Sequence, residues 1–185
     1  MKSVDAVKSK DEISAISHML EKHGNETYRD IWQLGLNLAL RISDLLSLTY
    51  DDFADGDTIT VVEGKTGKSR IIKLNEKAQT IVKQRQALNG NDKYLFQSVG
   101  NRAKGLLKPL SRESVARKFA EVGDIVGIHL GTHSMRKTRG YAMWDAGVSL
   151  EVICKVLNHS SPAVTMRYIG LEQADINKTY DDFVL

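Results

Sequence analysis

Two cationic stretches of the sequence have the residue types and the spacing to bind a phosphate group. In THSMRKTRG, His133 and Arg136 lie three residues apart at the start of an expected amphipathic helix, so they share one face beside free backbone N–H groups. Arg41 directly follows the apolar run of residues 34–40, where a cation either extends into solvent or meets an anion in a cleft. Each residue taken alone also fits an ordinary solvated position, so phosphate binding is one of two interpretations at this point.

Three further residues could take part in phosphate chemistry, although each has a structural alternative. Lys65 lies between two expected strands, where a solvated turn lysine is common. His159 follows an expected helix end and would by default be a structural histidine. Tyr168 is one of six tyrosines, and its local pattern does not distinguish it from a core tyrosine. The residues alone therefore leave the nucleophile unidentified.

The pattern of apolar residues places these side chains on a largely helical chain with one small sheet, an α+β fold that is mostly α-helical. Ser9 and Glu12 form a capping-box pattern before a first helix of about three turns. The strings TITVVE and SRIIKL, separated by GKTG, indicate an antiparallel β-hairpin. The other helices are expected at about residues 27–40, 76–88, 111–126, 133–146 and 149–157, and a last short one starts at Ser161 and Pro162.

Composition excludes several classes of protein. The 185 residues fit one domain or slightly more, and 42% hydrophobic with 26% charged residues is ordinary for a folded globular chain. No apolar run approaches the roughly 20 residues of a membrane span, and residues 1–10 lack the apolar core of a signal peptide. A cytoplasmic location is therefore expected. The single cysteine, Cys154, lies among apolar residues and is expected to be a buried thiol.

Positive charge is concentrated in one part of the chain, although the net charge is only +3. Residues 100–139 contain nine lysines and arginines against three acids, whereas residues 140–185 contain three against six. A solvated surface can produce such a distribution by chance. A face that binds a polyanion explains it better.

Four motifs together resemble the tyrosine recombinases of the phage integrase and Xer type. They are ALRISDLLSL around Arg41, GKTGKSRIIKL around Lys65, HSMR at residues 133–136 and LNHSSPAVTMRY, which ends at Tyr168. They occur in the order of the family, with 24 residues from Arg41 to Lys65, 23 from Arg136 to His159 and nine from His159 to Tyr168. The resemblance implies the catalytic-domain fold of that family, with its small antiparallel sheet on one side.

The resemblance implies DNA cleavage and rejoining without a metal or cofactor. In the family a tyrosine, here Tyr168, attacks a phosphodiester of double-stranded DNA and forms a 3′-phosphotyrosyl bond. Arg41 and Arg136 would bind the non-bridging oxygens of the transition state with fork-shaped, permanently charged donors. Lys65 would protonate the leaving 5′-oxygen.

The remaining site residues also receive their expected roles from the resemblance. His133 would lie near the tyrosine oxygen and act as the base, and His159 would donate a hydrogen bond to a phosphate oxygen. Asp44 would be the acidic residue that orients its neighbours.

Two positions depart from the family pattern. Asn158 stands where glycine is frequent before the histidine, and asparagine is the residue that tolerates a left-handed helix stop best after glycine. Ala39 replaces another frequent glycine, and little consequence is expected from that change.

Residues 1–185 are expected to form one catalytic domain with a tail helix at about 171–185, without the helical core-binding domain that typical members carry in front of it. The chain would then be either an excised catalytic domain, with a linker remnant at residues 4–8, or a member of the short fimbrial-switch type. In the tail, Ile176, Tyr180, Phe183 and Val184 form an apolar stripe. In the family such a tail docks on a neighbouring protomer, which implies a homotetramer on two DNA sites.

Two other functions remain compatible with the residues. A metal-free ribonuclease would use His133, His159 and Lys65 with a 2′-hydroxyl nucleophile, and Tyr168 would then be structural. A non-catalytic DNA-binding module would use its cations only to bind phosphates, with steep salt dependence and no strand breakage. A type IB topoisomerase would share the chemistry of the recombinases but act as a monomer.

Overall fold

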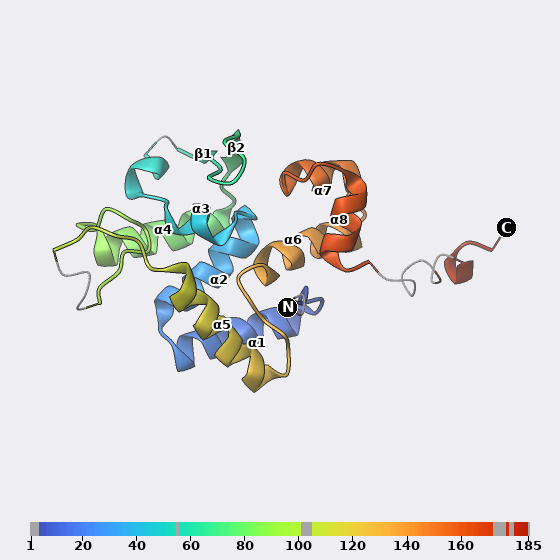
Figure 1. The fold of residues 1–185 in the computed structure, drawn as a ribbon, viewed down its shortest axis with the longest axis horizontal. Coiled ribbons are helices and arrows are strands. Elements are labelled where there is room, and N and C mark those ends of the chain that lie inside the picture. Colours follow the sequence, from blue (N-terminus) through green and yellow to red (C-terminus); the bar gives the residue numbers. More distant parts are fainter. Residues whose placement is uncertain (1–3, 55, 101–104, 172–176, 178–179, 185) are drawn as a thin grey trace.

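Helices make up most of the computed structural model, which describes residues 4–54, 56–100, 105–171, 177 and 180–184. The helices and strands follow the chain as α1 (Lys10–His23), α2 (Glu26–Leu38), α3 (Ile42–Leu46), the 3-10 turn η1 (Tyr50–Phe53), β1 (Thr58–Val62), β2 (Ser69–Lys73), α4 (Glu76–Asn89), α5 (Arg112–Val126), α6 (Ser134–Asp145), α7 (Leu150–Val156) and α8 (Pro162–Ile169). The α+β, mostly helical class predicted from the sequence is confirmed. Figure 1 shows α1, α2, α4 and α5 on one side and α6, α7 and α8 on the other.

Local signals in the sequence set the helix ends. Ser9 and Glu12 form both hydrogen bonds of the capping box that starts α1. Ser161 caps α8 and Pro162 occupies its first turn, where a missing N–H costs nothing. Asn158, just beyond α7, has φ +48°, so it adopts the left-handed conformation expected of a helix stop. The predicted boundaries agree with the structure to within about two residues.

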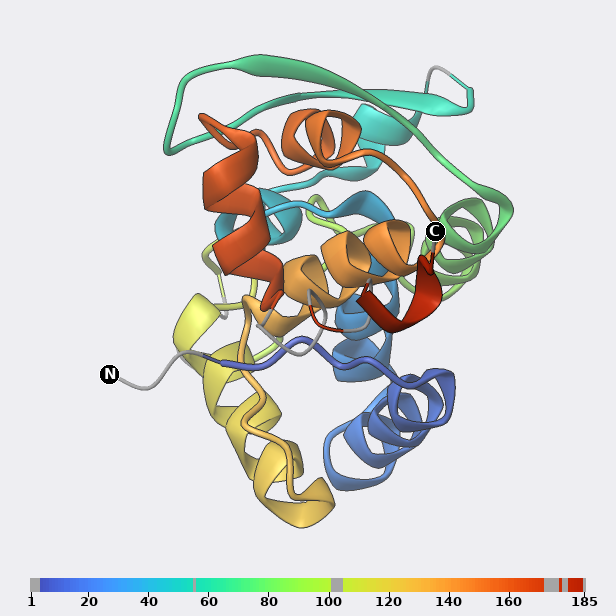
Figure 2. The same cartoon turned by 90° about the vertical axis from the view of Figure 1, so that its right-hand side faces the viewer.

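The predicted hairpin is present and lies along one edge of the molecule (Figure 2). β1 and β2 pair antiparallel, with Ile59 opposite Ile72. Ile59 and Val61 are buried, and the inward face continues to Glu63, which is also buried. Side chains alternate between the faces of a strand, so the strand that carries this apolar face delivers an acid to the interior at its end.

The core has two parts, which meet at α6. The larger part packs α1, α2 and α5 around Trp32 and Phe119, whose rings stand edge to face with centroids 5.8 Å apart. The smaller part contains Ile153 of α7, Leu157 at the end of α7, and Ile169 of α8. Helix α6 reaches the larger part through Met135 and the smaller part at Gly140, where a Cβ would lie 2.6 Å from Ile169 Cγ2. These helices therefore approach closely where the site residues of α6 and α8 lie.

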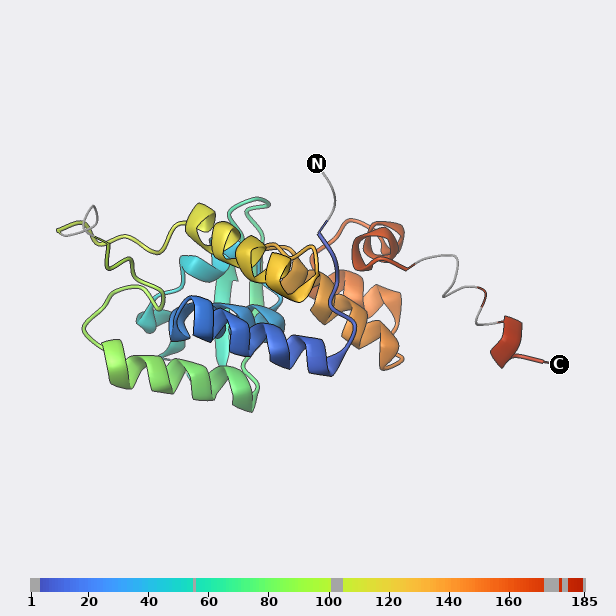
Figure 3. The same cartoon turned by 90° about the horizontal axis from the view of Figure 1, so that it is seen from below.

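The segment at residues 4–8, for which the sequence suggested a linker, packs against α6. Val7 is buried, and its N–H donates to the hydroxyl of Thr138 at 2.8 Å. Lys137 Nζ donates to the carbonyl oxygen of Val4 at 2.8 Å. The views in Figures 1 and 3 place this segment beside α6, between α1 and the α6–α8 side of the molecule.

The described part of the tail lies away from the rest of the domain (Figure 3). Tyr180, Phe183 and Val184 are 77%, 75% and 86% exposed, so three of the four residues of the predicted stripe contact no core. Ile176, the fourth, lies outside the described residues. Within the described part of the chain, no helix is both long and apolar enough to cross a bilayer.

Candidate active site

Residues from three distant parts of the sequence line a cleft of about 510 Å³. Arg41 enters it from the start of α3, Lys65 from the hairpin loop and His133 from the start of α6. Lys65 is exposed and makes no hydrogen bond or ion pair with any residue that the structure describes. The fold therefore brings a permanent cation, a free lysine and a histidine to one opening.

Arg136 is buried behind this cleft and is held by main-chain carbonyls. It is only 1% exposed; its Nη1 donates to the carbonyl oxygen of Ala39, and its Nη2 donates to that of Leu157 at 2.6 Å. Ala39 ends α2 and Leu157 ends α7, so both oxygens lie at the negative ends of helices. Burial lowers the pKa of Arg136, with a partly opposing effect of Tyr168, but a guanidinium stays charged in proteins.

Ala39 is more constrained than the sequence indicated. Its φ of +53° is left-handed, a conformation that favours glycine, yet its methyl group is buried beside Ile153 and Leu157. The replacement of glycine at this position therefore has a conformational cost that the sequence did not indicate. The unusual conformation turns the Ala39 carbonyl towards Arg136.

Tyr168 and His133 are paired. The phenol oxygen lies 3.1 Å from His133 Nδ1. Burial raises the pKa of Tyr168, against the lowering effect of Arg136, and burial together with the charge of Arg136 lowers the pKa of His133. A protonated phenol therefore faces a neutral imidazole, which is the arrangement needed for transfer of the phenol proton to Nδ1.

His159 covers the other side of Tyr168. The two rings stand edge to face with centroids 4.7 Å apart, and His159 Nδ1 lies 3.0 Å from the hydroxyl of Thr165. Burial, followed by the charges of Arg136 and Arg41, lowers the pKa of His159 to about 4. Its ring is therefore neutral at neutral pH. Nδ1 contacts Thr165, and Nε2 has no hydrogen-bond partner among the residues that the structure describes.

Glu63, which was not among the residues expected from the sequence, is the acid at the centre of the site. Its carboxylate has no exposed surface and accepts hydrogen bonds from Arg41 at 2.5 Å, Arg70 at 2.8 Å and Asn158 at 2.5 Å. Burial alone would raise the pKa of Glu63, but the hydrogen bonds from Arg70, Arg41 and Asn158 together lower it to about 2. A signal existed in the sequence, because Glu63 continues the alternation of Ile59 and Val61.

Asp44 contacts the backbone of the hairpin loop. Its Oδ1 accepts the N–H of Gly64 at 3.1 Å, whereas its Oδ2 is buried without a hydrogen-bond partner among the described residues. Gly64 immediately precedes Lys65. The orienting role expected for Asp44 would thus act on the loop of Lys65 rather than on a neighbouring side chain.

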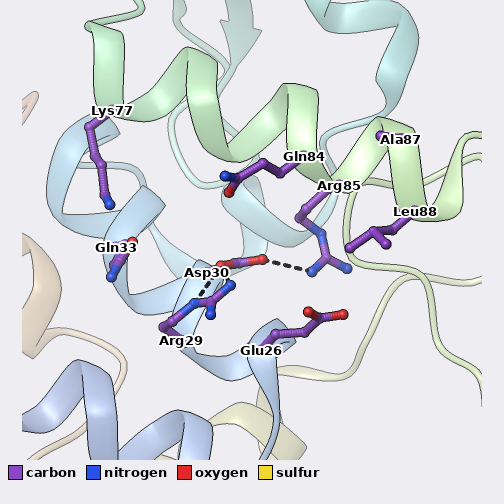
Figure 4. A pocket seen from close by; sticks show the side chains of 9 residues that line it. All are labelled: Glu26, Arg29, Asp30, Gln33, Lys77, Gln84, Arg85, Ala87 and Leu88. Carbon is purple, nitrogen blue, oxygen red and sulfur yellow. Dashed lines mark hydrogen bonds and ion pairs between the residues drawn. The ribbon is translucent and has the colours of Figure 1, made fainter.

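A second cavity, of about 560 Å³, lies between α2 and α4 and contains none of the predicted site residues (Figure 4). Its buried charged groups are paired with one another. Asp30 accepts hydrogen bonds from Arg85 at 3.1 Å and from Arg29 at 2.9 Å, and Asp30 and Arg85 are both buried. The buried pair of Asp30 and Arg85 therefore links α2 and α4 beside this cavity.

Comparisons with known proteins agree with this geometry. The model of the phage integrase family matches residues 7–174. The probable integrase/recombinase YoeC of Bacillus subtilis strain 168 is 34% identical over 99% of this chain and 98% of its own length. The tyrosine recombinase XerA of Pyrococcus furiosus is 33% identical over 70% of this chain. The chain covers nearly all of YoeC but only 45% of that XerA.

Solved structures show the same fold at lower identity. The crystal structure of XerA recombinase superimposes with a TM-score of 0.74 at 20% identity, over 98% of this chain and 65% of that one. XerH site-specific recombinase, bound to a palindromic difH substrate, superimposes with a TM-score of 0.76 at 15% identity over 95% of this chain and 51% of that one. The fold is that of a tyrosine recombinase catalytic domain. The chain belongs to the phage integrase family, which confirms the resemblance found in its sequence.

Proposed function

We propose that this protein is a site-specific recombinase that cleaves and rejoins double-stranded DNA through a 3′-phosphotyrosyl bond to Tyr168, and that residues 1–185 are its catalytic domain. The observation that carries the proposal is the 3.1 Å contact between the Tyr168 hydroxyl and His133 Nδ1, beside the buried cation of Arg136. A structural tyrosine would need neither a neutral base nor a guanidinium next to its oxygen. Both are needed if the phenol loses its proton to attack a phosphate.

The proposed reaction exchanges one phosphodiester for another. The Tyr168 oxygen forms a bond to phosphorus while its proton passes to His133, and the bond from phosphorus to the 5′-oxygen breaks. Lys65 gives a proton to that oxygen, so a free 5′-hydroxyl leaves. Arg41 and Arg136 stabilise the negative charge that gathers on the non-bridging oxygens. Rejoining is the reverse of these steps and needs no other energy source.

His159 donates a hydrogen bond to a non-bridging oxygen in this proposal. Its Nε2 must then carry the proton, which requires Nδ1 to accept the hydroxyl proton of Thr165, 3.0 Å away. Thr165 is fully buried at the inner face of α8, three residues before Tyr168. In this proposal the Thr165 hydroxyl therefore donates to His159 rather than to the carbonyl oxygen of Ser161, which lies 3.4 Å away.

Assembly on DNA is part of the proposal. A lambda integrase structure with a TM-score of 0.71 to this chain is described as a tetramer bound to a Holliday junction. We infer that this protein likewise acts as a homotetramer on two DNA sites, with the exposed tail as the element exchanged between protomers. Because such a protein must meet chromosomal or phage DNA, we place it in the cytoplasm.

The test is covalent trapping on a nicked suicide DNA substrate, from which the cleaved fragment diffuses away. The parent protein should form a covalent protein–DNA adduct, and Tyr168→Phe should form none while binding the same DNA. Tyr180→Phe is the matched control and should give the parent yield, because Tyr180 is 77% exposed in the tail.

An adduct of normal yield from Tyr168→Phe would refute the assignment of the nucleophile. Absence of any adduct from the parent protein, with salt-sensitive binding retained, would favour the non-catalytic DNA-binding module. Cleavage of RNA without a covalent adduct would favour the ribonuclease. EDTA should leave the yield unchanged.

A further inference from the structure

Resting on the DNA-cleavage function proposed above, we propose that Glu63 is a positioning residue of the active site, which fixes Arg41, the Lys65 loop and the turn before His159 relative to one another. Its carboxylate is fully buried directly after the end of β1. Glu63 would contact neither DNA nor Tyr168, so it would act only through its partners.

Each oxygen of Glu63 has a separate set of donors. Oε1 accepts from Arg70 at 2.8 Å. Oε2 accepts from Arg41 at 2.5 Å, from the Asn158 amide at 2.5 Å and from the Thr66 hydroxyl at 3.1 Å. Each carboxylate oxygen has about two lone-pair sites, so the three donors around Oε2 use it fully, whereas Oε1 has one donor among the described residues.

The bond to Arg41 fixes the plane of its guanidinium. A guanidinium has five N–H donors in a rigid planar fork, and the bond to Glu63 uses one of them. Arg41 also lines the cleft with Lys65 and His133. Anchoring one edge of the plane therefore leaves the other donors to face a phosphate in the cleft.

The bonds to the hairpin loop control Lys65. The backbone N–H groups of Thr66 and Gly67 donate to the Glu63 carbonyl oxygen at 3.3 and 2.8 Å, and the Thr66 hydroxyl donates to its carboxylate. Both the main chain and the side chain of Glu63 thus hold the turn that contains Lys65. The lysine itself has no other anchor among the described residues, so its placement depends on this turn.

The bonds to Asn158 and Arg70 connect the hairpin to the end of α7. Asn158 directly precedes His159, and Arg70 Nη2 also donates to the carbonyl oxygen of Val156 at 2.6 Å. Asn158 replaces a glycine that is frequent in the family, and its side chain supplies a donor that glycine lacks. The asparagine and the buried acid therefore form a pair, each giving the other its hydrogen-bond partner.

The test compares two DNA substrates, one with the normal bridging 5′-oxygen and one with sulfur in its place, because a thiolate leaves without the proton from Lys65. Glu63→Gln keeps the shape of the side chain but removes its charge. Cleavage of the oxygen substrate should fall by about 10²-fold, the scale of a small misplacement of catalytic groups. The fall in the cleavage rate of the sulfur substrate should be at least about tenfold smaller, because this substrate does not need the proton from Lys65.

Asp57→Asn is the matched control. Asp57 is an acid at the other end of the same hairpin, in an exposed pair with Lys73, and its replacement should leave both rates at the parent value. Asn158→Gly is a second test that does not depend on the folding of Glu63→Gln, since glycine adopts the φ of +48° without strain. This variant removes one hydrogen-bond donor to the Glu63 carboxylate and should slow cleavage of the oxygen substrate by about tenfold.

Parent rates on the oxygen substrate for both Glu63→Gln and Asn158→Gly would overturn the proposal. Equal losses on the two substrates would overturn the assignment of Glu63 to the Lys65 loop, because cleavage of the sulfur substrate does not need the proton from Lys65. Failure of the parent protein to form any adduct would instead refute the proposed function, before Glu63 is considered. The two failures are therefore distinguishable.

Discussion

At the scale of single residues, the lowered pKa of His159 makes the stability of the fold depend on pH. The pKa of His159 is lowered to about 4, chiefly by burial, from an unfolded value of about 6.5. Between these values the unfolded chain binds a proton at this position and the folded chain does not. His159 therefore destabilises the fold as pH falls from about 6.5 to 4 and has no such effect above pH 7.

We expect His159→Gln to reduce the loss of stability between pH 7 and pH 5. The measurement is urea unfolding at both pH values, with the difference in free energy compared between parent and variant. His18→Gln, at an exposed position of α1, is the control and should retain the parent difference. An unchanged pH dependence in His159→Gln would show that burial does not depress this pKa.

The residues of the site differ in how well the sequence predicted them. Arg41, Lys65 and His133 were chosen for their residue types and positions, and the structure brings them to one cleft. Tyr168 was identified only by the resemblance, because a tyrosine beside a histidine from 35 residues away has no local signature. Glu63 was missed, although it continues the alternation of inward-facing residues in its strand. A buried acid is expected only when donors are known to lie beside it, and the fold alone brings its two arginines and one amide together.

At the scale of elements, α6 and α8 must approach closely to bring the base and the nucleophile together. Gly140 permits this approach, because a Cβ there would lie 2.6 Å from Ile169 Cγ2 and 3.0 Å from Leu157 Cδ1. We expect Gly140→Ala to push α8 away from α6 and to displace Tyr168 from His133. A displacement of about 1 Å should slow DNA cleavage by about 10²-fold. The gain in helix propensity, about 1 kcal/mol, should offset much of the packing strain.

Single-turnover cleavage and thermal unfolding together check this expectation. Ile169→Leu removes the branching methyl group at nearly constant volume, so the double variant Gly140→Ala/Ile169→Leu should recover part of the lost rate. Full activity of Gly140→Ala would mean that α8 can shift without moving its tyrosine.

Element types and boundaries were predictable because their signals are local. The capping box at Ser9, the proline at residue 162 and the alternation in the hairpin act within a few residues. The close helix contacts were not predictable, because Gly140 resembles any helical glycine until α8 is placed against it. The left-handed Ala39 was missed for the same reason: only Arg136, far along the chain, explains why its carbonyl must turn.

At the scale of the whole molecule, the tail carries apolar side chains that its own domain does not cover. Tyr180 and Phe183 are both three-quarters exposed. An apolar segment of this kind is typical of helix-in-groove recognition between protomers. We therefore expect removal of the residues after Gly170 to abolish the synapsis of two DNA sites while a single protomer still binds one site.

Native gels of full-length and truncated protein with two labelled sites measure this effect. Tyr180→Ala/Phe183→Ala should behave like the truncation, whereas Asp181→Asn/Asp182→Asn, which changes only polar neighbours, should still form the synaptic complex. Equal amounts of synaptic complex in all variants would contradict an exchanged tail and indicate that the tail packs on its own domain.

The anchoring of Arg136 bears on how this fold can diverge. The two atoms that hold the guanidinium are main-chain oxygens, at Ala39 and Leu157, and every amino acid supplies such an oxygen. The neighbours of Arg136 can therefore be replaced one after another without loss of its anchors, provided that α2 and α7 keep ending where they do. The position of Arg136 therefore depends on the path of the main chain rather than on the side chains around it. The protein shares its fold with solved recombinases at only 15% to 20% identity, and an arginine secured in this way tolerates that degree of drift around it.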